Sequence, residues 1–258
     1  DRSVQRELPT VQKWMKQARK IILEGRTKGL CVEEKTSRCD LVTNVDKFIE
    51  KFYVDRIRET FPNSKILGEE GEADKGLDNF KGLLWIIDPI DGTMNFVKQH
   101  DHFASMIAVC ENGIEKLGYI LDVTEDKLYW GGPECGVFCN DQKVEPPKNL
   151  PLEEGLFGVG GKMLLSNYRN VQSAAKKSLG VRIYGSSGIE FIHVLTGKNV
   201  SYLSHLRPWD YAAGKILAET LGLVVKTIDE ESLDMLSSSD VLVATKNAHQ
   251  GIIKLMNS

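Results

Sequence analysis

The chain has 258 residues, of which 41% are hydrophobic and 27% charged, and its formal net charge is −3. This length and composition indicate a globular protein with one large domain or two layered subdomains. The small net charge makes a nucleic-acid partner unlikely on overall electrostatic grounds. No apolar run reaches the roughly 20 residues that span a bilayer, so no membrane attachment is expected.

The cysteines and the first residues bear on location. Five cysteines are an odd number and are scattered along the chain, which favours reduced thiols in a cytoplasmic protein. Residues 1–7 have no apolar segment and therefore do not resemble a secretory signal.

The N-terminal part is predicted to contain two helices followed by several strands. Residues 4–24 place apolar side chains on one helical stripe, and a second amphipathic helix follows Asp46, with Phe48 and Phe52 assigned to its apolar side. Short strands are predicted at residues 65–70 and 83–87. The β-favouring runs that follow, separated by turn residues, predict an antiparallel meander at residues 103–110, 116–122, 127–131 and 136–139.

The pattern changes after a proline-containing connector at residues 145–151. We therefore expect an N-terminal α+β subdomain at residues 1–147 and a C-terminal α/β subdomain at residues 148–258. In the second part, predicted strands at 156–160, 181–184, 200–204, 223–228 and 240–244 alternate with predicted helices at 163–179, 187–196, 209–221 and 246–257.

Residues 85–96 stand out because an apolar run stops at two aspartates. Leu83 to Ile87 read as a strand buried on both faces, which places Asp88 at its end. Pro89 and Gly92 then predict a sharp turn that carries Asp88 and Asp91. A helix beginning after Gly92 would direct free backbone N–H groups beside the two carboxylates. Together these features indicate a small site for a cation and a phosphate.

Other acidic residues stand at the ends of predicted elements. They form clusters at 40–46, at 69–70 and at Asp210. Carboxylates near buried strand ends need partners, and Mg²⁺ or Ca²⁺ are natural ones because they prefer oxygen ligands. Taken alone, each acid is more often a helix cap or a solvated loop residue. Their combination with the turn at 88–93 favours a metal site.

Four motifs of the chain resemble those of a known family. Residues 85–96 resemble the W-I-x-D-P-I-D-G-T-x-N-F motif of the inositol monophosphatase family, which are magnesium-dependent, lithium-sensitive phosphomonoesterases. Residues 68–70 are similar to its G-E-E segment, residues 40–46 to its D-L-V-T-x-x-D segment and residues 209–214 to its W-D-x-A-A-G motif. The four motifs occur in the family's order, and a Gram-positive bacterial branch is the most similar.

The resemblance implies a set of site residues. Glu69, Asp88 and the Ile90 carbonyl would hold one Mg²⁺, and Asp88, Asp91 and Asp210 a second, with two or three ions in all. The Gly92 and Thr93 N–H groups would bind phosphate near Lys35, and Asp46 would orient the Thr93 hydroxyl. The implied reaction is in-line attack by metal-activated water, with its proton accepted toward Glu69 and the Asp46–Thr93 pair.

The substrate is less determined than the reaction. Ser187 lies where the family lines its substrate pocket and is a candidate for binding a substrate hydroxyl. Inositol-phosphate members commonly carry an acid seven positions before the W-D aspartate, where this chain has Leu203. The segment 204–208 instead places His205 and Arg207 near the predicted metal site, and Arg207 suits a second phosphate. The alternative is that Arg207 pairs with a structural acid.

Three functions follow as hypotheses. The first is Mg²⁺-dependent hydrolysis of inositol monophosphate or a similar small polyol phosphate. The second is a phosphatase for a bisphosphate, with fructose 1,6-bisphosphate, adenosine 3',5'-bisphosphate or NADP as the phosphorylated substrate. The third is a non-enzymatic role with an RNA or transcription partner, against which the complete set of acids argues. The resemblance also implies a layered αβαβα sandwich of α+β class and a homodimer.

Overall fold

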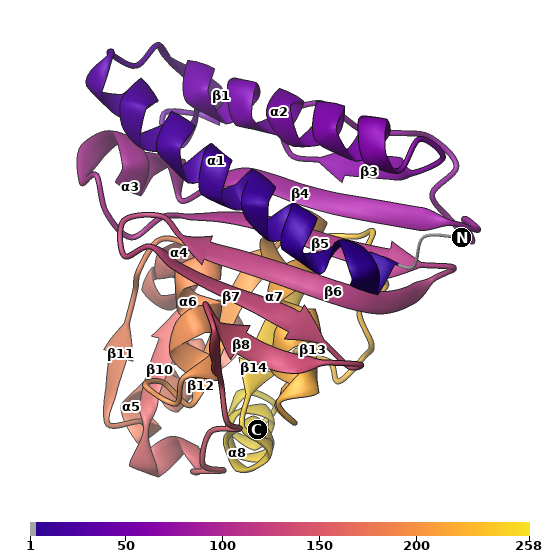
Figure 1. The fold of residues 1–258 in the computed structure, drawn as a ribbon. Coiled ribbons are helices and arrows are strands. Elements are labelled where there is room, and N and C mark those ends of the chain that lie inside the picture. Colours follow the sequence, from indigo (N-terminus) through magenta and orange to yellow (C-terminus); the bar gives the residue numbers. More distant parts are fainter. Residues whose placement is uncertain (1–3) are drawn as a thin grey trace.

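The computed structural model describes residues 4–258 and stacks helices and sheets in five layers (Figure 1). A pair of long helices covers a seven-stranded sheet, a second pair of helices lies beneath that sheet, and a five-stranded sheet with outer helices completes the stack. Separate hydrophobic cores fill the spaces between the layers. The predicted α+β fold class, a layered αβαβα sandwich, is confirmed.

The first layer consists of α1 (Leu8–Thr27), which follows a short 3₁₀ turn at Val4–Glu7, and α2 (Asn44–Thr60). Both helices bury one side against the larger sheet, as their amphipathic patterns predict. The predicted side of α2 is wrong at Phe48, which is 57% exposed. Ile49 is buried as predicted, and the buried side also includes Tyr53 and the carboxyl groups of Asp46 and Glu50.

The larger sheet has the strand order β3-β4-β5-β6-β7-β8-β9. Its first two strands are parallel and all later neighbours are antiparallel, which confirms the predicted meander. The strands are β3 (Lys65–Gly68), β4 (Leu83–Asp91), β5 (Ala104–Glu111), β6 (Ile114–Asp122), β7 (Lys127–Gly132), β8 (Gly136–Cys139) and β9 (Gln142–Lys143).

The middle layer is formed by α6 (Ser187–Leu195) and α7 (Pro208–Thr220), which pack between the two sheets. The smaller sheet has the order β11-β10-β12-β14-β13 and mixes parallel with antiparallel pairs. Its strands are β10 (Leu156–Val159), β11 (Gly180–Arg182), β12 (Ser201–Leu206), β13 (Val224–Thr227) and β14 (Ser239–Ala244).

The last layer contains α4 (Gly161–Leu165), α5 (Val171–Lys177) and α8 (Lys246–Met256). The continuous helix predicted at 163–179 is wrong, because a short 3₁₀ turn at Tyr168–Asn170 separates α4 from α5. Asn167, Arg169 and Asn170 there have φ of 50°, 48° and 65°, and left-handed residues end a helix. Another short 3₁₀ turn, Leu152–Glu154, precedes β10.

The sequence did not predict one hairpin close to the site. An antiparallel hairpin of β1 (Val32–Ser37) and β2 (Asp40–Thr43) lies between α1 and α2. Its first strand is mostly exposed, so it lacks the apolar pattern by which strands are recognised. Within residues 4–258, no helix is both long and apolar enough to cross a membrane.

Candidate functional site

The turn after β4 leads into the short helix α3 (Thr93–Lys98). Pairing between β4 and β5 becomes irregular between Asp88 and Asp91, so the strand runs through both aspartates instead of ending at Asp88. Gly92 has φ of 89° and ψ of 45°, a left-handed conformation that glycine adopts without steric cost. The predicted sharp turn is present, and Gly92 makes it possible.

Three aspartates from distant parts of the chain meet beside this turn. Asp88, Asp91 and Asp210 each offer a carboxylate oxygen, and these oxygens lie within 4.8 Å of one another. The three line a cavity of about 200 Å³, here called the carboxylate cavity, which is also lined by Glu69, Ile90, Gly92 and Thr93. All the residues predicted to hold metal therefore surround one space.

Asp88 and Asp91 have opposite surroundings. Asp88 is 1% exposed, and neither of its carboxylate oxygens has a hydrogen-bond partner among the described residues. Asp91 accepts hydrogen bonds from the Ser187 hydroxyl at 3.0 Å, from the Gly188 N–H at 2.7 Å and from the Ser186 hydroxyl. A buried carboxylate without a donor is costly, and a cation is the partner that would offset that cost for Asp88.

Crowding affects the titration of these carboxyl groups. Burial raises the pKa of Asp88 well above its usual value, and the charges of Glu69 and Asp91 raise it further. Burial likewise raises the pKa of Asp210, with added contributions from Asp91 and Glu69. A divalent ion in the cavity would reverse these effects because it favours the charged form of each carboxyl.

Asp46 connects α2 to the turn. Its Oδ1 accepts a hydrogen bond from the Thr93 hydroxyl at 2.7 Å, while its Oδ2 accepts from the Thr43 N–H at 3.0 Å. The Thr93 hydroxyl also lies 3.2 Å from the Ile90 carbonyl oxygen. Burial raises the pKa of Asp46, although the hydrogen bonds from Thr43 and Thr93 partly offset this. The predicted Asp46–Thr93 pair is therefore in direct contact at the cavity wall.

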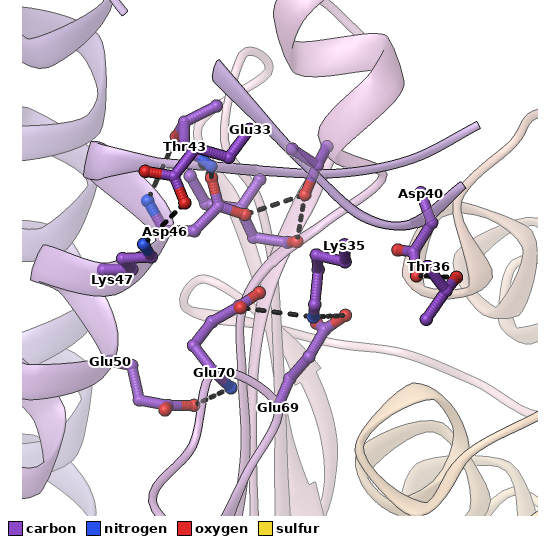
Figure 2. A network of polar contacts seen from close by, with 12 residues as sticks. Glu33, Lys35, Thr36, Asp40, Thr43, Asp46, Lys47, Glu50, Glu69 and Glu70 are labelled. Atoms are coloured by element: carbon purple, nitrogen blue, oxygen red, sulfur yellow. Dashed lines mark hydrogen bonds and ion pairs between the residues drawn. The ribbon is translucent and has the colours of Figure 1, made fainter. Parts of the chain in front are cut away.

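Lys35 on β1 lies beside two acids (Figure 2). Its Nζ is 3.2 Å from Glu70 Oε2 and 3.6 Å from Glu69 Oε1. Burial alone would lower the pKa of Lys35, but the charges of Glu69 and Glu70 outweigh burial and raise it. The unpredicted hairpin thus carries the predicted lysine to the edge of the carboxylate cavity.

A second cavity of about 210 Å³ shares Asp91, Gly185 and Asp210 with the first. We call it the adjoining cavity. Its other walls come from the C-terminal part of the chain and combine apolar side chains with hydroxyl groups: Val159, Ile183 and Leu206 with Ser186, Ser187, Tyr202 and Ser204. A ligand held in the carboxylate cavity could extend only a short way before meeting these walls.

Two residues predicted to contact substrate are placed differently from each other. Ser187 lines the adjoining cavity, but its hydroxyl donates to Asp91. Arg207 is exposed and lines neither cavity. Its guanidinium carbon is 5.8 Å from the Trp209 ring centroid, and its backbone N–H donates to Asp210 at 3.0 Å. Arg207 therefore contacts the site through its backbone.

The neighbouring positions on β12 follow strand alternation. Tyr202 and Ser204 face the adjoining cavity, whereas Leu203 is fully buried in the core on the other side of the smaller sheet. His205 also turns away, and its Nδ1 lies 2.9 Å from Asp240. The expected approach of His205 to the metal site is therefore not seen.

Sequence reasoning missed Glu190 on α6, which lines the adjoining cavity and is 1% exposed. Its Oε2 accepts the Tyr184 N–H at 3.2 Å, and its Oε1 has no partner among residues 4–258. Burial raises the pKa of Glu190 to about 8. The available signal was a single acid in the mostly apolar run Ile189 to Leu195, because acidic side chains are rarely buried without a partner.

This layered fold, with a buried group of carboxylates around a glycine turn, agrees with the class expected from the sequence motifs, a phosphomonoesterase. The model of the inositol monophosphatase family matches residues 4–258. The chain therefore belongs to the inositol monophosphatase family, and the predicted family and enzyme class are confirmed.

Similar proteins support this assignment. Inositol-1-monophosphatase of Bacillus subtilis is 40% identical over 248 residues, covering 94% of this chain and 93% of the relative. Fructose-1,6-bisphosphatase/inositol-1-monophosphatase of Thermotoga maritima is 30% identical over 227 residues, covering 88% and 86%. A crystal structure of an IMPase/NADP phosphatase complexed with Mg²⁺ and phosphate has a TM-score of 0.92 and 30% identity, covering 100% of this chain and 97% of the neighbour.

Proposed function

We propose that the protein hydrolyses inositol monophosphate, or a similar small polyol phosphate, in a reaction that requires Mg²⁺. The observation that carries this proposal is the pair of buried Asp88 oxygens without donors, at the centre of a cavity lined by other carboxylates. Such a cavity suits a hard divalent cation that takes oxygen ligands. The similarity to the Bacillus subtilis enzyme supports inositol phosphate as the substrate.

The metal ligands proposed are those predicted from the sequence. Glu69, Asp88 and the Ile90 carbonyl would hold one Mg²⁺, and Asp88, Asp91 and Asp210 another, with room for two or three ions as a further proposal. Their common place around one cavity supports this grouping. When bound, such ions neutralise phosphate charge and make water a stronger nucleophile at neutral pH.

The remaining roles fall to groups around the turn. The backbone N–H groups of Gly92 and Thr93 would bind phosphate oxygens, and Lys35 would supply positive charge beside Glu69. The proton of the attacking water would go to Glu69, or to Asp46 by way of the Thr93 hydroxyl, which would take the water proton as it gives its own to Asp46. The 2.7 Å hydrogen bond to Asp46 orients that hydroxyl and leaves its lone pairs free to accept from the water.

Phosphate release from inositol 1-phosphate tests the function. The protein should release phosphate with Mg²⁺ and lose this activity in EDTA, and Mg²⁺ should bind the Asp88→Asn variant far more weakly by calorimetry. Absence of Mg²⁺-dependent release from any small polyol phosphate would contradict the proposal.

A second candidate is hydrolysis of a bisphosphate. The names of the Thermotoga maritima relative and of the IMPase/NADP phosphatase neighbour favour it. Arg207 is the candidate for binding a distal phosphate. Its backbone N–H donates to Asp210, and its side chain is exposed. If so, Arg207→Ala should lower kcat/KM for fructose 1,6-bisphosphate and leave that for inositol 1-phosphate unchanged. An equal effect on both substrates would contradict this role.

Location and assembly are separate proposals. The five cysteines are free in the structure, two of them exposed, which supports a reducing and therefore cytoplasmic environment. The family resemblance supports a homodimer and lithium sensitivity, which light scattering and inhibition by LiCl would test. A non-enzymatic role with an RNA or transcription partner would be favoured only if Asp88→Asn preserved the cellular function.

A further inference from the structure

α2 carries a second buried carboxyl group, one helical turn beyond Asp46. Glu50 is 2% exposed and lies on the same side of the helix as Asp46. Its Oε1 accepts the backbone N–H of Glu70 at 2.9 Å, and its Oε2 accepts the N–H of Glu72 at 3.3 Å. Figure 2 shows this carboxylate directed at the backbone of the segment that bears Glu69 and Glu70.

The segment 68–72 is shaped around this carboxylate. A Cβ atom on Gly68 would lie 2.3 Å from Glu50 Oε1, so the carboxylate occupies space that any other residue at 68 would fill. The Glu69 N–H continues the sheet by donating to the Ile87 carbonyl at 3.2 Å. The backbone on both sides of Glu69 is thus fixed, by β4 on one side and by Glu50 on the other.

Glu50 has no other evident task. Within residues 4–258 it forms no ion pair, and its hydrogen bonds are those to the two loop N–H groups. It lines neither the carboxylate cavity nor the adjoining cavity. Burying a carboxyl group without a cation is costly, and an apolar side chain of similar volume at position 50 would avoid that cost. Its bonds to the loop are the benefit that the structure shows.

We propose that Glu50 is a positioning residue that holds segment 68–72 so that Glu69 reaches the carboxylate cavity and Glu70 reaches Lys35. The inference rests on the proposed function, since Glu69 acts there as a metal ligand. Asp46 and Glu50 would then divide the work of α2: Asp46 fixes the Thr93 hydroxyl, and Glu50 fixes the opposite wall.

The test compares Glu50→Gln with the unaltered protein. Glutamine has the same size, but its NH₂ group meets one of the two loop N–H groups as a second donor. In the metal-free variant, hydrogen exchange at the Glu70 and Glu72 amides should accelerate. Mg²⁺ affinity measured by calorimetry should fall about 10- to 100-fold, the usual effect of losing a residue that orients a metal ligand. Activity should recover partly at high Mg²⁺ concentration.

Tyr53→Phe is the matched control. Tyr53 lies on the same helix, is fully buried and shares a 2.7 Å hydrogen bond with Ser105, away from segment 68–72. Its loss should lower the melting temperature without changing Mg²⁺ affinity or exchange at residues 70 and 72. A purely structural role for Glu50 would make the two variants alike.

Gly68→Ala provides an independent variant if Glu50→Gln fails to fold. The added methyl group displaces the same carboxylate from the loop side and should produce the same faster exchange and weaker Mg²⁺ binding. A folded Glu50→Gln or Gly68→Ala protein with unchanged exchange and unchanged affinity would overturn the inference. Hydrogen exchange needs no substrate, so this result stands apart from any failure of the proposed phosphatase activity.

Discussion

The two cavities of the site differ in what holds their walls. The carboxylate cavity is lined by charged groups from four separated segments, and its walls are tied together by hydrogen bonds such as those of Asp46 and Asp91. The adjoining cavity has a similar volume, about 210 Å³ against about 200 Å³, but combines apolar side chains with hydroxyl groups from the smaller sheet and α6. We therefore propose that the reaction and the choice of substrate depend largely on different parts of the chain.

This division has a measurable consequence. Changes in the carboxylate cavity should reduce the rate for every phosphate ester to a similar degree, because each ester presents the same phosphate there. If the leaving group extends into the adjoining cavity, changes there should alter the preference between substrates.

The largest effect is expected for Asp88→Asn. Loss of an orienting partner alone costs 10- to 100-fold in such sites, so loss of a ligand should lower kcat/KM by more than about 100-fold for all substrates. In EDTA at alkaline pH, the free energy of unfolding of the variant should be about 1 kcal/mol larger than that of the unaltered protein. The reason is that the substitution removes a buried carboxylate that has no hydrogen-bond donor. Phosphate release measures the first effect, and urea titration in EDTA measures the second. A variant less stable in EDTA would contradict this account of Asp88.

Thr93→Val comes next. It removes the hydroxyl that donates to Asp46 and should lower kcat by about 100-fold, the scale of proton-transfer catalysis. Thr93→Ser keeps the hydroxyl and should retain most of the activity. The two variants should affect inositol 1-phosphate and 4-nitrophenyl phosphate equally. Unequal effects on the two substrates would show that the carboxylate cavity also selects the substrate.

Glu190→Gln examines the acid in the adjoining cavity. The pKa of Glu190 is raised to about 8, above the ordinary value of 4.5, so its contribution to stability is present below pH 4.5 and is lost as the pH rises through 8. Glutamine does not titrate. The unaltered protein should therefore lose more unfolding free energy than the variant between about pH 5 and about pH 8.5, on the order of a few kcal/mol. Urea titrations in EDTA at both pH values measure the difference, and parallel pH dependences would disprove the assignment.

Ser204→Ala should have the smallest effect. One hydrogen bond to a substrate hydroxyl contributes about 1 kcal/mol, which is roughly a 5-fold change. The ratio of kcat/KM for inositol 1-phosphate to that for 4-nitrophenyl phosphate should fall by about this factor, since only the first substrate has ring hydroxyls. The rate with 4-nitrophenyl phosphate serves as the control and should stay unchanged. An unchanged ratio would show that Ser204 does not contact the substrate.

Local patterns predicted the mixed α and β elements, whereas the resemblance to the family implied the layered sandwich and the set of residues around the carboxylate cavity. Apolar runs marked the strands, and the motifs at 40–46, 68–70, 85–96 and 209–214 marked the acids. The hairpin β1–β2 escaped prediction because its first strand is largely exposed. Phe48 was misplaced because helical periodicity alone did not show that α2 buries Asp46 and Glu50 with its apolar side chains.

The adjoining cavity was harder to predict because its walls depend on strand register and on contacts across long sequence separations. Leu203 and Ser204 are adjacent in sequence, yet only the register of β12 determines which of them faces the cavity. Ser187 was expected to meet a substrate hydroxyl, and its bond to Asp91 follows from the position of α6 against β4. Neither arrangement has a local sequence signal.

Asp91 takes its hydrogen bonds from residues 95 to 97 positions further along the chain, and Asp210 lies later still. Most of the acids are therefore synthesised long before the segment that orders them. If the proposed site is correct, an emerging chain would have no complete carboxylate cavity until Asp210 has been synthesised, and hydrolysis would begin only after that. Two pieces divided at the connector 145–151 would likewise be inactive alone and would regain the reaction only by reassociating.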